Sequence, residues 1–246
     1  KFKNLSGYIK RKFLVKTEVF RKRKKFYIEK KDKDKITKYS NDYKNFNFDN
    51  VLFLEGHFES EKYFRNYRND IKNEFKFKNL ESLKKNHYLN EINRENSVSF
   101  CIRQNRFIEG RGQNTSLNKE KSWKFTLEQI NYINKSADYI KSKISDPTFF
   151  LWSNDFSNIH KDKFNFIYKE VKLNDNEDSL DKRIQHLYLL TQCNHFIVTT
   201  STFNWWGAWL SERKNKIILR PSNNFFSDFY LNNKDFWPSN WNIISE

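Results

Sequence analysis

The most constraining stretch of the sequence is 195–210, which reads HFIVTTSTFNWWGAWL. Residues 196–200 form a short apolar and β-branched run with the length and composition of a buried strand. Ser201 and Thr202 follow at once, and both are residue types that commonly cap a helix N-terminus. Residues 204–213 are predicted to form a helix. We therefore expect a buried strand that turns directly into a helix.

A corner of this kind can bind an anion. The free N–H groups of the first helical turn point outward, and the helix dipole adds partial positive charge there. Gly207 inside the helix costs about 1 kcal/mol relative to alanine, which indicates close packing at that position. From these features alone, an ordinary strand–turn–helix corner with a Trp-rich core face that binds nothing remains the alternative.

Strand and helix patterns alternate through the second half of the chain. Strands are predicted at 97–102, 148–152, 164–168, 196–200 and 216–219. Helices are predicted at 123–144, 179–192 and 204–213. This alternation implies parallel β pairing with right-handed crossovers. The fold class is therefore α/β, with a doubly wound, Rossmann-like C-terminal domain that binds ligands at the carboxyl ends of its strands.

The first half has weaker patterns. Residues 1–49 are strongly charged and show little periodicity, so no structure is assigned to them. A short strand is predicted at 51–54, followed by a helix capped at Ser60. Tyr67, Ile71 and Phe75 recur at helical spacing in a mostly polar segment. The expected organisation is a partial N-terminal lobe at 1–95, the Rossmann-like domain at 96–222, and a tail at 223–246 that packs back on the fold.

The formal net charge of +16 favours anionic partners. Much of it lies in Lys10–Lys35, for which a solvated surface is the first interpretation. Attachment to an anionic membrane surface ranks second. Nucleic acid ranks last, because no helix-turn-helix, zinc-finger or RNP-like pattern is visible. A basic protein that binds membranes or nucleic acid without catalysis is thus one possible function.

No apolar run is long enough to span a membrane, and no signal-peptide pattern opens the chain. The sequence contains no Met, not even at position 1. We therefore expect a fragment or an extracted domain, in which an absent signal proves little. The expected location is the cytoplasm or the cytoplasmic face of a bacterial-type membrane, with anchorage undetermined.

Three stretches of this sequence resemble glycosyltransferase family 11, the α1,2-fucosyltransferases. STFNWWGAWL (201–210) matches the family's STFSWWGAWL signature except at Asn204. LYLLTQCNHFIV (187–198) looks like the helix and strand that lead into this signature. LEGHFESEKYF (54–64) is similar to the family's LEGYFQSEKYF-type segment, which suggests that it borders the substrate cleft.

The resemblance runs with gaps from about Val51 to Pro221. The family's N-terminal GGLGNQMFQY-type segment has no counterpart in this sequence. The resemblance therefore implies a GT-B type fold with an incomplete N-terminal lobe.

A further motif, CIRQNRF (101–107), stands where the family shows an HxRRGDY-type sequence. Arg103 matches the first arginine of that motif, which contacts the donor diphosphate. Cys101 replaces the histidine, and three further positions also differ. Arg103 can still form a bidentate, charge-assisted pair with a phosphate, and Arg106 can restore the lost charge. We assign Arg103 as a catalytic and donor-binding residue and Arg106 as donor-binding; two solvated loop arginines are the alternative.

FFLWSNDF (149–156) resembles the family's FFIFSDDI-type segment, with Asp155 at its second acidic position. A carboxylate just past a strand suits a ribose hydroxyl or a guanine N–H, although a helix-capping role is the alternative. The predicted site thus has the base near Asp155. The phosphates lie between Arg103 and the helix that starts at Ser201 and Thr202.

The function implied by the resemblance is inverting transfer of fucose from GDP-fucose to a glycan hydroxyl. No DxD-type metal motif stands at a strand end, so we expect no metal and no cofactor besides the donor substrate. Fixed cationic donors can stabilise a departing diphosphate. His57 and Glu109 are the candidates for acceptor or cleft residues, and no general base is assigned. A relative that uses another nucleotide sugar, or an inactive homologue, is the rival within this class.

Overall fold

The structure is a computed structural model. It describes residues 25–29, 38–45, 52–78, 80–94, 96–109, 112–157, 159–173, 179–228 and 231–246. The chain divides into two compact units. The first comprises Lys1–Asn66 and Leu231–Pro238, and the second comprises Tyr67–Tyr230 and Ser239–Glu246. The expected boundary was at residue 95, whereas the structure divides the chain between Asn66 and Tyr67. Residues 67–95 therefore belong to the second unit, which contains the large sheet.

The first unit holds a two-stranded parallel sheet of β1 (Lys25–Ile28) and β2 (Leu52–Glu55). The predicted strand at 51–54 is thus confirmed over its described part. The short helices of this unit are η1 (Asn41–Asn45), η2 (Glu61–Tyr63) and α9 (Asn233–Phe236), with η3 (Arg65–Tyr67) at its border. Ser60 caps η2 by accepting the Lys62 N–H at 3.3 Å, so the capped helix is a single 3-10 turn. Most of Lys10–Lys35 lies outside the described residues.

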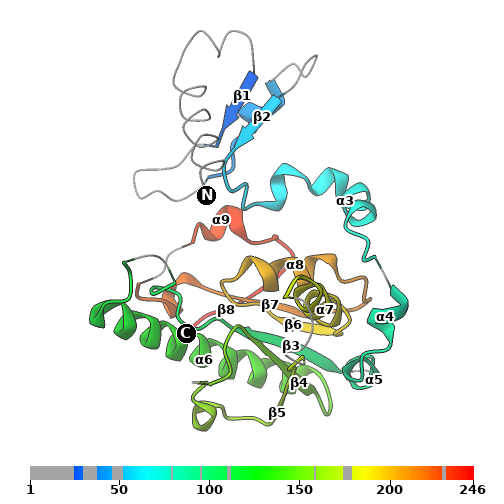
Figure 1. Ribbon diagram of the computed structural model, residues 1–246, viewed down its shortest axis with the longest axis vertical. Helices are drawn as coiled ribbons and strands as arrows, with labels where there is room; N and C mark the ends of the chain where they lie inside the picture. Colours follow the sequence, from blue (N-terminus) through cyan, green and yellow to red (C-terminus); the bar gives the residue numbers. More distant parts are fainter. Residues whose placement is uncertain are drawn as a thin grey trace. The chain divides into compact units, whose positions relative to one another are not determined.

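The second unit is built on a six-stranded, wholly parallel sheet (Figure 1). Its strands are β3 (Ser97–Ile102), β4 (Thr148–Ser153), β5 (Tyr168–Glu170), β6 (His195–Ile197), β7 (Ile218–Pro221) and β8 (Asn242–Ile244). Their order is β5-β4-β3-β6-β7-β8. Renumbered from β3, this is the 3-2-1-4-5-6 order of doubly wound nucleotide-binding sheets. The α/β prediction is confirmed.

Two parts of this sheet differ from the sequence-based expectation. The predicted strand at 164–168 is wrong, because β5 begins only at Tyr168. Phe164 and Phe166 instead pack their rings around Phe100, with centroids 5.9 and 5.5 Å away. The edge strand β8 was not predicted and pairs in parallel with β7. Phe164 and Phe166 therefore pack on the sheet, and only Tyr168 extends it.

The helices of the second unit are α3 (Arg68–Glu74), α4 (Leu80–Lys84), α5 (Tyr88–Ile92), α6 (Ser116–Lys143), α7 (Ser179–Thr191) and α8 (Thr202–Leu210), with short turns η4 (Lys161–Lys163) and η5 (Asn223–Phe225). The long helix α6 starts before the predicted position, because Thr115 caps it by accepting the Asn118 N–H at 3.2 Å. The predicted apolar stripe near α3 is largely exposed, at 63% for Tyr67 and 51% for Phe75. Phe75 still stacks on the Trp206 ring of α8.

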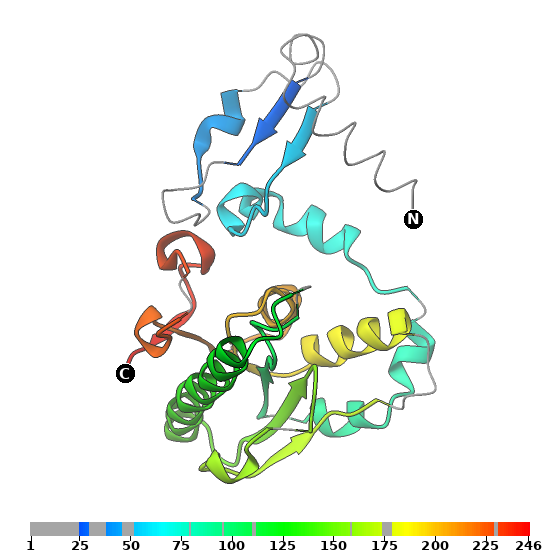
Figure 2. The ribbon, with the colours of Figure 1, turned by 60° about the vertical axis from the view of Figure 1, so that its left-hand side comes forward.

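The sheet separates α6 on one side from α7 and α8 on the other (Figure 2). Alternate residues of β3 explain this layering: Phe100 and Ile102 join the core under α6, whereas Cys101 points the opposite way. A Cβ on Gly207 would lie 1.8 Å from Cδ2 of Leu190 on α7. Gly207 thus permits the close approach of α7 and α8, as predicted. Among the described residues, no helix is both long and apolar enough to cross a membrane.

Candidate active site

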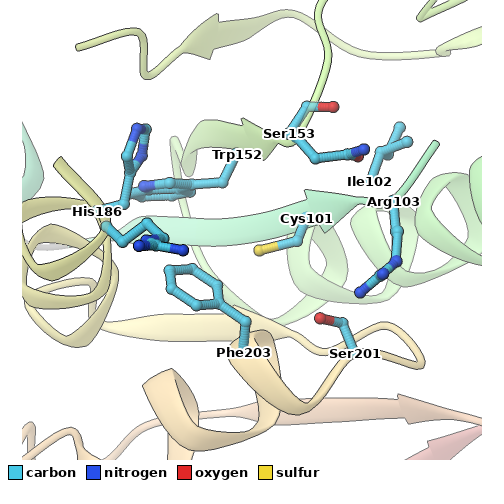
Figure 3. A pocket seen from close by; sticks show the side chains of 10 residues that line it. Cys101, Ile102, Arg103, Trp152, Ser153, His186, Ser201 and Phe203 are labelled. Atoms are coloured by element: carbon cyan, nitrogen blue, oxygen red, sulfur yellow. The ribbon is translucent and has the colours of Figure 1, made fainter. Parts of the chain in front are cut away.

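A cavity of about 230 Å³ lies at the carboxyl ends of β3, β4 and β6 (Figure 3). It is lined by Cys101, Ile102, Arg103, Trp152, Ser153, Asn154, Arg183, His186, Ser201 and Phe203. The strands β4 and β5 lie on one side of β3, whereas β6, which follows them in the sequence, pairs with β3 on its other side. The strand order thus reverses between β3 and β6. Doubly wound sheets bind ligands in the crevice at this reversal. The topology therefore positions this cavity as the candidate site.

Arg103 is the first residue after β3, and its backbone is fixed from α6. The Arg103 N–H donates to Gln129 Oε1 at 3.1 Å, and Gln129 Nε2 donates to the Arg103 carbonyl at 2.9 Å. Gln129 is buried. This pair of hydrogen bonds holds the start of the loop, so the Arg103 side chain leaves from a defined point at the cavity wall.

The Arg103 guanidinium has both an engaged and an unengaged end. Its Nη2 forms an ion pair with Glu109, and both side chains are about 40% exposed. Its Nε is buried and has no hydrogen-bond partner within the described part of the chain. Trp152 Nε1, in the same cavity, is also buried without a partner there. Buried donors are normally satisfied, so these two nitrogens are exceptions in the wall of the cavity.

The N-terminus of α8 faces Arg103 across the cavity. Ser201 is the N-cap residue, as predicted, but its side chain makes no capping hydrogen bond. Its hydroxyl and the N–H groups of the first turn are thus available to an anion. Figure 3 shows the Arg103 side chain directed toward Ser201. Thr202 begins α8 but is exposed and does not line the cavity.

Asn204 is the single departure from the signature of the resembling family, and it has a structural role. Its side chain is fully buried, and Nδ2 donates to the carbonyl of Ile197 at 3.2 Å. This hydrogen bond joins the first turn of α8 to β6. Asn204 therefore ties the strand–helix corner together from within the core.

The end of β4 presents Ser153 and Asn154 to the cavity, whereas Asp155 is not among the lining residues. The Asp155 carboxylate accepts hydrogen bonds from the Ser157 hydroxyl at 2.6 Å and the Ser157 N–H at 2.8 Å. These bonds lower the pKa of Asp155. Asp155 thus forms a local turn, which is nearer to the capping alternative than to a base-binding role.

The remaining predicted residues are dispersed. The Arg106 guanidinium lies 5.8 Å from the centre of the Phe125 ring and does not line the cavity. Glu109 is brought to the site only through its ion pair with Arg103. His57 belongs to the first unit, where its backbone N–H donates to Glu29 Oε2 at 2.7 Å.

The far wall of the cavity was missed by the sequence analysis. Arg183 and His186 lie three residues apart on α7 and therefore share one helix face. Burial, together with the charge of Lys182, lowers the pKa of His186 to about 4, so its imidazole is neutral at pH 7. Trp152 and Phe203 add aromatic surface. The i, i+3 spacing of Arg183 and His186 on the helix before β6 is the sequence signal that could have identified them.

These groups can act on two kinds of chemical moiety. A guanidinium and a helix N-terminus at one end suit phosphate oxygens. Two aromatic side chains with a second guanidinium at the other end suit a flat heterocycle with hydrogen-bond acceptors. Within the described residues, no group of three His, Cys, Asp or Glu side chains is placed to hold a metal ion.

Comparison with known proteins identifies relatives of this chain. A family model described as Glycosyl transferase family 11 matches residues 8–245. An alpha-1,2-colitosyltransferase from Escherichia coli is 26% identical over 189 residues, which is 76% of this chain and 60% of that protein. Galactoside alpha-(1,2)-fucosyltransferase 2 from Bos taurus is 32% identical over 93 residues, covering 36% of this chain and 25% of that enzyme. The chain thus spans well under the full length of these relatives, and no solved structure is matched.

Proposed function

Because the chain belongs to glycosyl transferase family 11, we propose that the protein transfers fucose from GDP-fucose to a glycan hydroxyl. The observation that carries this proposal is that Arg103 and the N-terminus of α8 line one cavity at the reversal point of the sheet. The donor diphosphate would lie between them. A GT-B arrangement, in which residues of the N-terminal part serve the acceptor, belongs to the same proposal.

The reaction that suits this geometry is a displacement at the anomeric carbon. The acceptor oxygen forms a bond to that carbon as the bond to the diphosphate oxygen breaks, and GDP leaves with the bonding electron pair. The configuration at the anomeric carbon is inverted, and the acceptor hydroxyl releases its proton to water, since no side chain is assigned as the general base. The Arg103 guanidinium and the α8 N–H groups would stabilise the charge that develops on the diphosphate. Fixed cationic groups can do this without a metal ion.

The base would occupy the end of the cavity near Trp152 and Phe203. Guanine presents two adjacent acceptors, O6 and N7, which an arginine can contact in bidentate fashion. Arg183 is the lining residue with that donor geometry. Adenine carries an amino group in place of O6, so its N–H donors would face the N–H donors of the Arg183 guanidinium. This wall therefore favours a guanine nucleotide.

The sugar and the setting of the reaction are proposed on different grounds. The Escherichia coli relative is named for colitosyl transfer and the bovine relative for fucosyl transfer, so a second deoxysugar donor is the alternative within this function. Attachment to an anionic membrane through Lys10–Lys35 stays a prediction, because most of that segment lies outside the described residues.

Calorimetric titration of the full-length protein tests the proposal. GDP, GDP-fucose, UDP and ADP are added first in the presence of a chelator and then with Mg²⁺ or Mn²⁺. We expect guanine nucleotides to bind selectively and without metal. Equal affinity for UDP and GDP would contradict the assignment of the base site. The absence of all nucleotide binding would reject the transferase proposal.

A further inference from the structure

A second cavity lies at the same edge of the sheet, on the side covered by α6. It also measures about 230 Å³ and is lined by Gln104, Asn105, Ile108, Lys119, Ser122, Trp123, Thr126 and His160. We propose that this cavity binds a sugar ring of the glycan acceptor, with Trp123 as its stacking platform. The inference rests on the proposed transferase function and adds a subsite for one ring of the acceptor, beyond the contacts that the GT-B arrangement assigns to the N-terminal part.

Trp123 is the first observation that supports a ligand. It lies on the long helix α6, and 54% of its surface is exposed although its indole lines a cavity. The His160 ring meets the indole edge-on, with centroids 5.7 Å apart. Large aromatic side chains are normally buried, so an exposed indole in a concave wall is informative. The C–H groups on one face of a pyranose ring pack well on such a surface.

The backbone around this cavity is the second observation. Asn105 and His160 both adopt positive φ angles, 60° and 30°, although neither is glycine. Such conformations are uncommon for residues other than glycine, although Asn and His adopt them more readily than most. The two residues come from different loops, after β3 and after β4, yet line the same cavity. The fold thus places two left-handed backbone positions around one small space.

The polar groups of the wall fit the hydroxyl groups of a sugar. Asn105 and His160 supply a carboxamide and an imidazole, and Lys119 supplies an ammonium group. Within the described residues, Lys119 forms no salt bridge. Small-molecule sites typically combine apolar surface with a few convergent polar groups. This wall therefore combines the exposed indole of Trp123 with hydrogen-bonding side chains that line the same cavity.

The loop after β3 separates this cavity from the first cavity, which is proposed to bind the nucleotide and is named the nucleotide cavity. Arg103 lines one and its neighbours Gln104 and Asn105 line the other. Gln104 is 4% exposed; its backbone N–H donates to Asn154 Oδ1 at 2.8 Å, and its Nε2 donates to the Asp155 carbonyl at 2.6 Å. The partition is therefore fixed to the end of β4. A sugar on Trp123 would lie across this partition from the donor diphosphate.

Saccharide binding to the whole protein tests the inference. Methyl β-galactopyranoside, methyl β-glucopyranoside and methyl N-acetyl-β-glucosaminide are titrated with and without GDP, for the wild type and for Trp123→Ala. We expect Trp123→Ala to weaken saccharide binding by about tenfold, since stacking on an aromatic ring contributes on that scale. Trp123→Phe should recover part of the affinity. Leu117→Ala is the matched control, because Leu117 is 58% exposed on the same helix and lies outside the cavity.

Different results of this experiment would reject the transferase proposal and the acceptor-site proposal. GDP affinity reports on the transferase proposal and should be the same in wild type, Trp123→Ala and Leu117→Ala. If the wild type binds GDP but none of the saccharides, or if Trp123→Ala binds them as well as the wild type, the acceptor site is overturned. Saccharide binding that depends on Trp123 in a protein that does not bind GDP would support the sugar site and reject the transferase.

Discussion

The two cavities have the same volume and share one edge of the sheet, yet their walls differ in origin. The cavity beside α7 and α8 is lined mainly by residues at strand ends, with Arg103 and Ser201 taken from contiguous motifs. The cavity beside α6 draws its wall from scattered positions on a helix and two loops. Sequence motifs at strand ends can therefore predict the residues of the first cavity. The role proposed for Trp123 in the second cavity depends on its exposure, which only the tertiary structure shows.

Arg103→Ala should have the largest effect on this comparison. Loss of a charged hydrogen-bond donor typically costs about 1.5–3 kcal/mol, which corresponds to roughly 10- to 100-fold weaker GDP binding. Saccharide affinity should stay unchanged, because the Arg103 side chain lines only the nucleotide cavity. Calorimetric titration of both ligands measures the contrast. Arg106→Ala removes the same charge and should leave GDP binding nearly intact, so a larger loss in Arg106→Ala would exchange the roles of the two arginines.

Gly207→Ala should act on the nucleotide cavity through the packing of α8. Alanine is normally better than glycine in a helix by about 1 kcal/mol, but here its Cβ would overlap with Leu190. Overpacking of this kind costs about 1–3 kcal/mol, so urea denaturation should show a lower free energy of unfolding. Nucleotide binding should weaken more than saccharide binding, since α8 carries Ser201 and Phe203.

A compensating variant checks this mechanism. Gly207→Ala combined with Leu190→Ala provides space for the new methyl group. The double variant should be more stable than the sum of the two single effects predicts, because the two positions are in contact. Strict additivity would show that the clash does not determine the stability of Gly207→Ala.

Much of this architecture could be predicted from the sequence, because periodicity and caps are local signals. The strand at Ser97–Ile102 and the end of α6 follow from apolar patterns and from Pro147. The edge strand β8 was missed because it is only three residues long, begins with the polar Asn242, and pairs with β7, from which it is separated by other elements in the sequence. Phe164–Tyr168 was misassigned because a β-like composition also suits rings that pack on a sheet.

Two of the predicted site residues line the cavity. Ser201 was chosen from the strand–helix corner, and Arg103 from the resemblance of CIRQNRF to a family motif. The orientation of Asp155 was not predictable, because the hydrogen bonds from Ser157 compete with any ligand. Arg183 and His186 were missed because their role depends on how α7 packs across the sheet. Trp123 was assigned to a helix without a function, since its exposure is a tertiary property.

Glu109→Gln should have the smallest effect and the opposite sign. In the ligand-free protein the Glu109 carboxylate pairs with the Arg103 guanidinium, which is the group proposed to bind the diphosphate. A bound diphosphate would therefore compete with this internal anion for the guanidinium. Because both side chains are about 40% exposed, solvent screens the pair, and such pairs contribute about 0–1 kcal/mol. Removing the charge should tighten GDP binding by up to about fivefold.

Ionic strength separates this competition from a positioning role for Glu109. The gain in Glu109→Gln should be largest at low salt and should shrink as salt screens the exposed pair. Glu120→Gln, an exposed carboxylate on α6 that lines neither cavity, controls for the change in net charge. Weaker GDP binding in Glu109→Gln would mean that the carboxylate holds Arg103 in its binding orientation. Saccharide affinity should not respond in either variant, because neutral hydroxyl groups do not compete for the guanidinium, and the two cavities would then differ in charge dependence as they do in origin.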